Sequence, residues 1–506
     1  MFSIEQLSQM VQRHLGLANN VNELQITPKW TIKESPLSGR GLFATEDISP
    51  GEVLFVDHPL IYGPRSGAII QRGCTVCCKL NTNKFYKCPK CSLLLCSEAC
   101  QNNNAHYDDC RIISAWYNKV TIEEVDDTLL SRALTAIRAL LLNEDQKQFM
   151  SSLQAHMLPQ HGTEIRELQQ FFDIPTQDAM FMTLASCVLD ANAFQIATYY
   201  GRKEMGKRGL YPVSSLMNHN CVPNTRYNYN SDLQMIVKAV KPIQAGCEIF
   251  TCYTGLLWGT PARRIHLYKT KHFLCKCERC ADPTERGTML AALKCFSREC
   301  PGSLLPLEPL KSSSTWRCLE CSLRVPSDNI CTLQRALGSL IGSLDFGNIN
   351  ELENFFLKRV TRYVPKTNQI VIDLQCRLIW ELGEVDGLRW HELSESRLVL
   401  KENLCRDTLR TAAALGAGDA HLRGLLLYHL HAALAERARR YPDLYEDLKS
   451  EIESTISQAY NILQGDISAP PDLELRRQYL GPGCEKTHEE RFFILDTSDD
   501  FKLSIK

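Results

Sequence analysis

Eight residues of the types that bind zinc lie within one short segment, and their spacing strongly limits how this segment can fold. They follow one another with two, ten, two, four, three, five and three residues between them: Cys74, Cys77, Cys88, Cys91, Cys96, Cys100, His106 and Cys110. Two cysteines separated by two residues bring both thiolates onto one tetrahedral zinc at about 2.3 Å. The four half-sites predict two closed structural zinc sites rather than disulfides, which need an oxidising compartment that no other feature indicates.

The length and the charge of the chain limit its class. At 506 residues it is too long for a single core, so we expect about two to four folded units. It has no stretch of eighteen apolar residues and no basic and then apolar N-terminus, which argues against membrane spans and a secretory signal. The net charge of −1 argues against nucleic-acid binding, which needs a basic surface. We expect a soluble, intracellular protein.

Hydrophobic periodicity divides the chain into strand-rich and helix-rich segments. Apolar residues three and four apart predict a helix at the N-terminus, helices between about 111 and 185, and helices again beyond about 330. Residues 40–63 and 186–256 contain short β-branched and aromatic runs between turns, as half-buried strands do. The C-terminal helices fit antiparallel pairs such as a tetratricopeptide-like stack, although no clean repeat period is present.

Two further groups of cysteines have the spacing of zinc ligands. The first offers three thiolates: Cys275, Cys277 and Cys280. A tetrahedral zinc needs a fourth ligand, and Cys221 is the best donor for it. The second group forms a C-x4-C and a C-x2-C pair, typical of a small zinc ribbon: Cys295, Cys300, Cys318 and Cys321. For this group, four buried thiols are the alternative.

Several motifs taken together resemble one protein family. The sequences LYPVSSLMNHNCVPN, AGCEIFTCY and CKCERC resemble the core and post-SET segment of SET-domain lysine methyltransferases. The eight-ligand segment resembles the MYND finger, a protein-interaction module. A SET domain interrupted by a MYND finger is the signature of the SET and MYND domain-containing (SMYD) family. Lys271, the run ADPTERGT and the added four-cysteine ribbon are similar to its arthropod-type branch.

The resemblance implies which ligands share a zinc. In the MYND finger the first and third ligand pairs hold one zinc, here Cys74, Cys77, Cys96 and Cys100. The second and fourth pairs hold the other zinc, here Cys88, Cys91, His106 and Cys110. A register with Cys78 in place of Cys77 is an alternative. In the SET family the cysteine after Asn-His, here Cys221, completes the post-SET zinc site, and the ribbon would hold a fourth ion.

The implied fold class is α+β and multidomain, a β-rich SET fold interrupted by the MYND finger, with a post-SET zinc segment and a C-terminal α-helical domain. The expected segments are an N-terminal helix (1–24), the SET N-terminal part (25–73), the MYND finger (74–110), a helical SET insert (111–185), the core SET segment (186–256), the post-SET zinc segment (257–282), the four-cysteine ribbon (290–325) and the helical, tetratricopeptide-like domain (330–506).

The family resemblance also implies S-adenosylmethionine as the cofactor. The turn SGRGLFA would approach it, with Arg40 as a contact for its carboxylate, to which a guanidinium is geometrically suited. The complete set of implied cofactor contacts is Gly39, Arg40, Gly41, Asn192, Ser215, Asn218, His219 and Phe273. In isolation these residue types are more often turn residues and backbone hydrogen-bonding partners than ligands, so only their combined order supports this interpretation.

Methyl transfer requires a neutral lysine amine, and only about one lysine in 2,500 is neutral at pH 7. In the family a tyrosine hydroxyl aligns this amine in a narrow channel, and Tyr253 occupies that position. Lys271 falls where many members have a second channel tyrosine. Pointing inward, its charge would lower the pKa of the substrate lysine but oppose entry of the cation. If it points outward, another side chain or water would replace the tyrosine.

The resemblance predicts a protein-lysine N-methyltransferase that acts on lysines of histone or non-histone proteins in the cytoplasm and nucleus. The alternative is a catalytically weak or inactive adaptor, whose MYND finger binds proline-containing partner peptides, for instance in transcriptional regulation. A nucleic-acid-binding zinc protein is a third hypothesis, which the neutral overall charge disfavours. We expect a monomer that does not associate with membranes.

Overall fold

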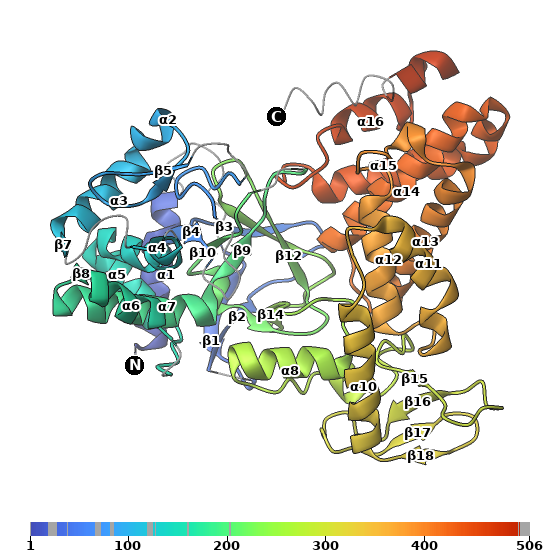
Figure 1. Ribbon diagram of the computed structural model, residues 1–506, viewed down its shortest axis with the longest axis horizontal. Helices are drawn as coiled ribbons and strands as arrows, with labels where there is room; N and C mark the ends of the chain where they lie inside the picture. Colours follow the sequence, from blue (N-terminus) through green and yellow to red (C-terminus); the bar gives the residue numbers. More distant parts are fainter. Residues whose placement is uncertain are drawn as a thin grey trace. The chain divides into compact units, whose positions relative to one another are not determined.

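The structure, a computed structural model, describes residues 2–18, 28–37, 39–65, 72–80, 85–118, 125–126, 128–158, 161–201, 204–493 and 495. The chain forms two compact units (Figure 1). The N-terminal unit consists of Met1–Asn218, Tyr227–Ile249 and Gly465–Ala469. The C-terminal unit consists of His219–Arg226, Phe250–Gln464 and Pro470–Lys506.

Three small sheets are centred on the N-terminal unit. The first has the strand order β1 (Trp30–Glu34), β2 (Arg40–Ala44), β14 (Glu248–Thr251), β11 (Asn218–His219). The second has the order β4 (Ile61–Pro64), β10 (Lys207–Leu210), β9 (Phe194–Ile196), and the third the order β12 (Thr225–Tyr229), β13 (Met235–Ala239), β3 (Val53–Asp57). The division between the two units falls within β11, β12 and β14.

The pairing joins strands that lie far apart in the sequence. β2 pairs with β14 in antiparallel register, with Leu42 opposite Ile249, and β3 pairs with β13, with Phe55 opposite Val237. Each of these four residues except Phe55 is completely buried, and Phe55 is nearly so. The chain between the paired strands is therefore an insertion into one continuous β-rich domain.

The insertion contains the eight-ligand segment and a group of helices. Short pairs β5 (Tyr86–Lys87) with β6 (Leu94–Leu95) and β7 (Tyr117–Asn118) with β8 (Phe172–Asp173) accompany these helices. The helices of the N-terminal unit are α1 (Ile4–Ala18), α2 (Glu98–Gln101), α3 (Asn104–Ala115), α4 (Leu129–Arg138), α5 (Glu144–Ser152), α6 (Thr163–Phe171) and α7 (Thr176–Asn192). The expected limit of the helical insert at residue 185 falls inside α7. Of the expected N-terminal helix, residues 19–24 lie outside the described residues.

Helix α4 is the centre of this helical group. It is buried on nearly all sides, since every residue from Leu129 to Ile137 except Arg132 is buried, and it packs against β4, α6 and α7. At its C-terminal end the Arg138 guanidinium donates two hydrogen bonds of 2.7 and 3.0 Å to the buried carboxylate of Asp109 on α3. This buried pair connects the eight-ligand segment to the helical group.

The C-terminal unit combines a four-stranded sheet with a stack of helices (Figure 1). The sheet has the order β15 (Leu293–Lys294), β16 (Ser303–Pro306), β17 (Trp316–Cys318), β18 (Arg324–Val325). The helices are α8 (Thr260–Lys271), α9 (Glu278–Ala281), α10 (Ser327–Gly342), α11 (Ile349–Lys358), α12 (Gln369–Glu381), α13 (Glu395–Ala414), α14 (His421–Arg440), α15 (Tyr445–Leu463) and α16 (Leu473–Leu480). One apolar core contains side chains of both the sheet and the helices, so the two segments fold as one body.

Helix α14 lies at the centre of the helical stack. It packs against α13 and α15, and most of its residues between Gly424 and Ala438 are buried. Tyr428 on α14 donates a hydrogen bond of 2.5 Å to Asp472, which also accepts one of 2.7 Å from Arg476 on α16. In the described part of the chain, no helix combines the length and apolar character that a membrane span requires.

We expect Leu426→Ala to lower the free energy of unfolding by about 2–5 kcal/mol, because Leu426 is completely buried in α14 and its truncation leaves a cavity. Urea denaturation followed by circular dichroism measures this change. The matched control is Leu357→Ala on α11, where the side chain is 51% exposed and the loss should stay below about 0.5 kcal/mol. Equal losses in both variants would contradict the position of α14 in the core.

Candidate zinc and cofactor sites

The eight ligands near the N-terminus form two quartets. One contains Cys74, Cys77, Cys96 and Cys100, and the other contains Cys88, Cys91, His106 and Cys110. Within each quartet all ligand atoms lie within 4.8 Å of one another, and neighbouring sulfurs are 3.5 to 4.0 Å apart. A tetrahedral zinc with 2.3 Å Zn–S bonds requires sulfurs about 3.8 Å apart. Both quartets therefore have the dimensions of a zinc site.

Local hydrogen bonds orient the ligands of these quartets. The Nδ1 atom of His106 lies 2.7 Å from the carbonyl oxygen of Gln101, so Nδ1 carries the proton and Nε2 faces the sulfur of Cys91 at 3.5 Å. Such a bond on the far ring nitrogen is usual for a histidine that binds zinc. The hydroxyl of Ser97 caps α2 by accepting a hydrogen bond from the amide of Cys100, which fixes that ligand on the helix.

The structure selects Cys77 over Cys78 for the first quartet. The Cys77 sulfur lies 3.5 Å from that of Cys96, whereas Cys78 belongs to none of the four quartets. Cys78 is buried, and its carbonyl oxygen accepts a hydrogen bond of 2.7 Å from the amide of Met205. It therefore acts as a packing residue beside the site.

The ribbon cysteines form another quartet in the C-terminal unit, made of Cys295, Cys300, Cys318 and Cys321. Sulfur pairs are 3.5 and 3.6 Å apart. The amide of Gly302 donates to the Cys300 sulfur at 3.4 Å, and a Cβ atom on Gly302 would lie 2.7 Å from the Cys318 sulfur. Glycine lets the backbone approach the quartet, as a zinc knuckle requires.

The remaining quartet joins Cys221 to Cys275, Cys277 and Cys280 in the C-terminal unit. The Cys221 sulfur lies 3.5 Å from that of Cys280, although 59 positions separate them in the sequence. Two N–H groups approach this sulfur, Nε of Arg263 at 3.1 Å and Nε2 of His219 at 3.2 Å. A neutral thiol sulfur is a weak acceptor, while a metal-bound thiolate accepts strongly. The donor set fits a zinc thiolate.

Buried charges surround this quartet. The guanidinium groups of Arg263 and Arg279 are fully buried, and both contact the carboxylate of Glu285, at 2.6 and 3.2 Å. Burial lowers the pKa of Arg263, but the negative charges of Glu285 and of the Cys221 and Cys280 sulfurs outweigh it and raise the pKa above its usual value, so the guanidinium stays charged. Four thiolates that hold a Zn²⁺ ion would carry a charge of about −2, and the surplus positive charge of this ion-pair network would offset part of it.

In the N-terminal unit, the start of β2 brings the backbone close to a buried carboxylate. A Cβ atom on Gly41 would lie 2.3 Å from Oε1 of Glu248 and 3.0 Å from Nδ2 of Asn218. That carboxylate is 8% exposed and accepts hydrogen bonds from Ser35 at 2.9 Å and Asn218 at 2.7 Å. The second glycine of SGRGLFA is therefore required by close packing. The first, Gly39, has a φ of +56°, which glycine adopts most easily.

Arg40 and Asn192 each keep polar capacity that no described residue satisfies. The Nη2 atom of Arg40 donates to the carbonyl oxygen of Ser152 at 2.7 Å, while its buried Nη1 has no partner among the described residues. Nδ2 of Asn192 donates to the carbonyl oxygens of Gln154 and Val188, both at 2.7 Å, and leaves Oδ1 as an acceptor. An unpartnered guanidinium N–H suits a carboxylate, and an amide oxygen suits an ammonium group.

The side chains of two other predicted cofactor contacts, Ser215 and Asn218, form hydrogen bonds within the protein. The hydroxyl of Ser215 donates to the carbonyl oxygen of Tyr211 at 2.7 Å, within a short turn that the buried Asp57 carboxylate fixes through the amide of Ser214 at 2.7 Å. Nδ2 of Asn218 donates to Glu248 and, at 3.1 Å, to the carbonyl oxygen of Arg40. These side chains therefore help to organise the group of predicted site residues in the N-terminal unit.

Tyr253 lies in an aromatic cluster of the C-terminal unit. Its amide donates to Nδ1 of His219 at 3.0 Å, and the two rings are 5.2 Å apart. Phe273, 37% exposed, lies 6.0 Å from the His219 ring. Burial lowers the pKa of His219 to about 4, so its ring is neutral at pH 7. Nζ of Lys271 lies 5.6 Å from the centre of the Tyr253 ring, so Lys271 points toward the tyrosine.

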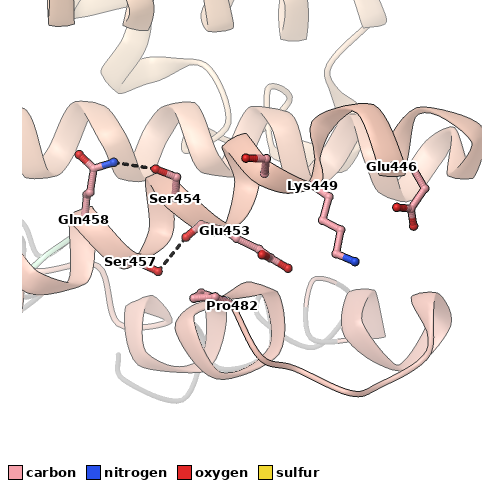
Figure 2. A pocket seen from close by; sticks show the side chains of 8 residues that line it. Glu446, Lys449, Glu453, Ser454, Ser457, Gln458 and Pro482 are labelled. Carbon is pink, nitrogen blue, oxygen red and sulfur yellow. Dashed lines mark hydrogen bonds between the residues drawn. The ribbon is translucent and has the colours of Figure 1, made fainter.

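The predicted site residues therefore form two groups, one in each unit. No sequence pattern pointed to Glu248, Arg263 or Glu285, because a single charged residue in a strand, helix or loop has no distinctive spacing. A groove of about 530 Å³ along α15 includes no predicted site residue (Figure 2). It is lined by Glu446, Lys449, Ser450, Glu453, Ser454, Ser457, Gln458 and Pro482. Since none of the predicted site residues lines it, this groove is not the candidate site.

We expect Gly41→Ala to reduce the free energy of unfolding by about 1–3 kcal/mol, because the added methyl group displaces a carboxylate that Ser35 and Asn218 hold in place. Chemical denaturation of the purified chain measures the change. Gly338→Ala is the control, since a Cβ there meets nothing within 4 Å. In the middle of α10 it should stabilise by about 0.5–1 kcal/mol. Unchanged stability of Gly41→Ala would contradict the close packing.

Comparisons with known proteins identify the family. The SET domain profile matches residues 39–254. The SET domain-containing protein SmydA-8 of Drosophila melanogaster is similar to this chain: isoform B is 30% identical over 84% of this chain and 94% of its own length, and isoform A is 32% identical over 83% and 91%. The mouse histone-lysine N-methyltransferase SMYD3 is 27% identical over 64% of this chain and 80% of its own length.

A solved structure described as the SET domain of LSMT bound to lysine and AdoHcy aligns over 99% of both chains, with 14% identity and a TM-score of 0.30, which is too weak a likeness to support a conclusion. The two SmydA-8 isoforms, by contrast, match over more than nine-tenths of their length at 30% identity or above. With its SET domain, its cysteine quartets and its C-terminal helices, the chain belongs to the SMYD family, in the arthropod-type branch.

Proposed function

We propose that this chain is an S-adenosylmethionine-dependent protein-lysine N-methyltransferase with Tyr253 as its catalytic residue. The observation that carries this proposal is the position of Tyr253. Its amide donates a hydrogen bond to the buried ring of His219, and its own ring contacts both the His219 ring and the Lys271 ammonium. Membership of a family with lysine methyltransferases such as mouse SMYD3 supports it. The substrates would be lysines of histone or other proteins.

In each unit, taken by itself, the residues present suit one part of S-adenosylmethionine. Unpartnered Nη1 of Arg40 would bind its carboxylate, and Oδ1 of Asn192 would accept from its amino group. The main chain of His219 and the exposed ring of Phe273 would contact the adenine, since both nitrogens of the His219 ring are already engaged. When bound, the cofactor supplies an electrophilic methyl group.

The chain must also provide a neutral substrate amine. The Tyr253 hydroxyl would orient the amine by hydrogen bonding, and the half-buried site would disfavour its charged form. The Lys271 ammonium, on the Tyr253 ring, would lower the pKa of a lysine that enters beside it. The same charge would weaken binding of the cationic substrate. Lys271 would therefore favour the neutral form of the substrate lysine and lower the affinity for its charged form.

A second candidate function is an adaptor that binds proline-containing peptides through the MYND finger. The observation that favours it is the position of the Lys271 ammonium over the Tyr253 ring, where its charge would oppose a cationic substrate. In the finger, Tyr107 on α3 is 69% exposed and offers an aromatic surface of the kind that binds proline. We propose a monomer, present in cytoplasm and nucleus, for either function.

Methyl transfer tests the two candidates. With labelled S-adenosylmethionine and a cell extract, the wild-type chain should label proteins, and Tyr253→Phe should lower labelling by about 100-fold, because the amine loses its orientation. The control is Tyr268→Phe on α8, where the ring is 61% exposed and labelling should not change. Wild-type chain that labels nothing but binds proline-rich peptides would overturn the enzyme and support the adaptor.

The pH dependence of methylation tests the role of Lys271. Removing a neighbouring positive charge raises the pKa of the substrate lysine, because the ammonium form is no longer disfavoured. The pH at which Lys271→Met reaches half of its maximal rate should therefore rise, by up to about one unit. Lys269→Met, in the last turn of the same helix, is the control. A downward shift in Lys271→Met would contradict this role.

We also propose that the four quartets each bind one zinc ion. Elemental analysis of the purified chain should give about four zinc ions per molecule, since each quartet has four suitable ligands. Cys110→Ser should lose about one ion, whereas Cys331→Ser, exposed on α10 and outside every quartet, should lose none. A wild-type value of two or fewer would contradict the proposal.

A further inference from the structure

The side chain of His219 connects Tyr253 to the Cys221 quartet, and all of these residues belong to the C-terminal unit. One ring nitrogen, Nδ1, lies 3.0 Å from the amide nitrogen of Tyr253, and the other, Nε2, lies 3.2 Å from the Cys221 sulfur. The ring is only 6% exposed. A side chain that the family resemblance assigns to the cofactor is thus engaged inside the protein.

The two contacts determine the tautomer of the ring. A backbone amide can only donate, so Nδ1 of His219 must accept and carries no proton. The proton of the neutral ring is then on Nε2 and points at the Cys221 sulfur. The hydrogen bonds therefore run in one direction, from the Tyr253 amide to the ring and from the ring to the sulfur.

The sulfur at the end of this series is a strong acceptor only when it is a thiolate. Arg263 donates to it as well, at 3.1 Å, and to the Cys280 sulfur at 3.4 Å. Cys221 is completely buried, and an unbound buried thiolate is unfavourable unless a metal compensates its charge. Zinc in this quartet would therefore strengthen the bond that orients the His219 ring.

The position of Tyr253 depends on this ring because the adjacent strand has already ended. β14 ends at Thr251, two residues before the tyrosine, so the amide of Tyr253 lies outside the sheet ladder. Its hydrogen bond to His219 replaces a ladder bond. The His219 ring also lies 5.2 Å from the ring of Tyr253 and 6.0 Å from the ring of Phe273.

We infer that His219 is a positioning residue that couples the Cys221 zinc site to Tyr253, so that zinc bound by this quartet fixes the main chain at the tyrosine. The inference rests on the proposed function only in treating Tyr253 as the catalytic residue. The coupling itself is a property of the folded chain, whether or not it transfers methyl groups. It gives this zinc site a positioning role that the ribbon quartet, in the same unit, does not have.

Amide hydrogen exchange of the full chain, resolved at Tyr253 by mass spectrometry, measures the coupling directly. Loss of a buried hydrogen bond opens the amide, so His219→Ala should raise its exchange rate by about tenfold. His266→Ala is the matched control, since His266 packs on the Trp258 ring and is not bound to Cys221. Equal exchange at Tyr253 in wild type and His219→Ala would overturn the inference.

Two conservative variants separate the two bonds of the ring. His219→Gln keeps a donor near Nε2 but loses the acceptor near Nδ1, so Tyr253 should exchange rapidly while zinc content stays at the wild-type value. His219→Asn keeps an acceptor near Nδ1, so Tyr253 should stay protected even when a zinc ligand is removed. Rapid exchange of the Tyr253 amide in His219→Asn but not in His219→Gln would contradict the assigned tautomer.

Removing one zinc ligand tests the dependence on metal. Cys280→Ser in the Cys221 quartet and Cys321→Ser in the ribbon quartet should each lose about one zinc ion. Only Cys280→Ser should raise exchange at Tyr253, by about tenfold. Equal effects of the two variants at Tyr253 would overturn the coupling. These experiments measure zinc content and amide exchange, and none of them measures methylation. A chain that transfers no methyl groups could therefore still show the coupling, so failure of the proposed enzyme activity and failure of the coupling are distinguishable.

Discussion

The C-terminal unit is organised around the quartet of Cys221, Cys275, Cys277 and Cys280, because this quartet brings together ligands from segments far apart in the sequence. The sulfurs of Cys221 and Cys280 are 3.5 Å apart across 59 sequence positions. A structural zinc contributes about 10–16 kcal/mol in finger peptides, comparable to the net stability of a whole domain. The buried ion pairs of Arg263, Arg279 and Glu285 beside it are favourable only if they offset a negative charge.

The sequence was most informative where chemistry imposes a spacing. All sixteen proposed zinc ligands come together in the four predicted quartets, since a tetrahedral ion tolerates few loop lengths between paired cysteines. The α+β SET fold with C-terminal helices is confirmed, and the motifs that identified the family were short. Domain limits were harder to predict: residue 185 falls inside α7, and the ribbon shares its core with the C-terminal helices.

The sequence could not reveal groups whose importance comes only from burial. Glu248 alternates in an ordinary strand, yet its carboxylate organises Ser35, Asn218 and the approach of Gly41. For His219, the resemblance predicted cofactor binding, while the structure engages both of its ring nitrogens within the fold. A side chain's partners depend on which distant segments pack beside it, and periodicity carries no information about that.

The dipeptide Asn218–His219 contacts both groups of site residues. In a strand, successive side chains point to opposite faces, and β11 consists only of Asn218 and His219. The amide of Asn218 donates to Glu248 within the N-terminal unit, and the ring of His219 reaches Cys221 and Tyr253 within the C-terminal unit. Each group of site residues is therefore held by its own network, and a single peptide bond connects the residues at which the two networks begin. A substitution at either residue would loosen one network directly and leave the hydrogen bonds of the other in place.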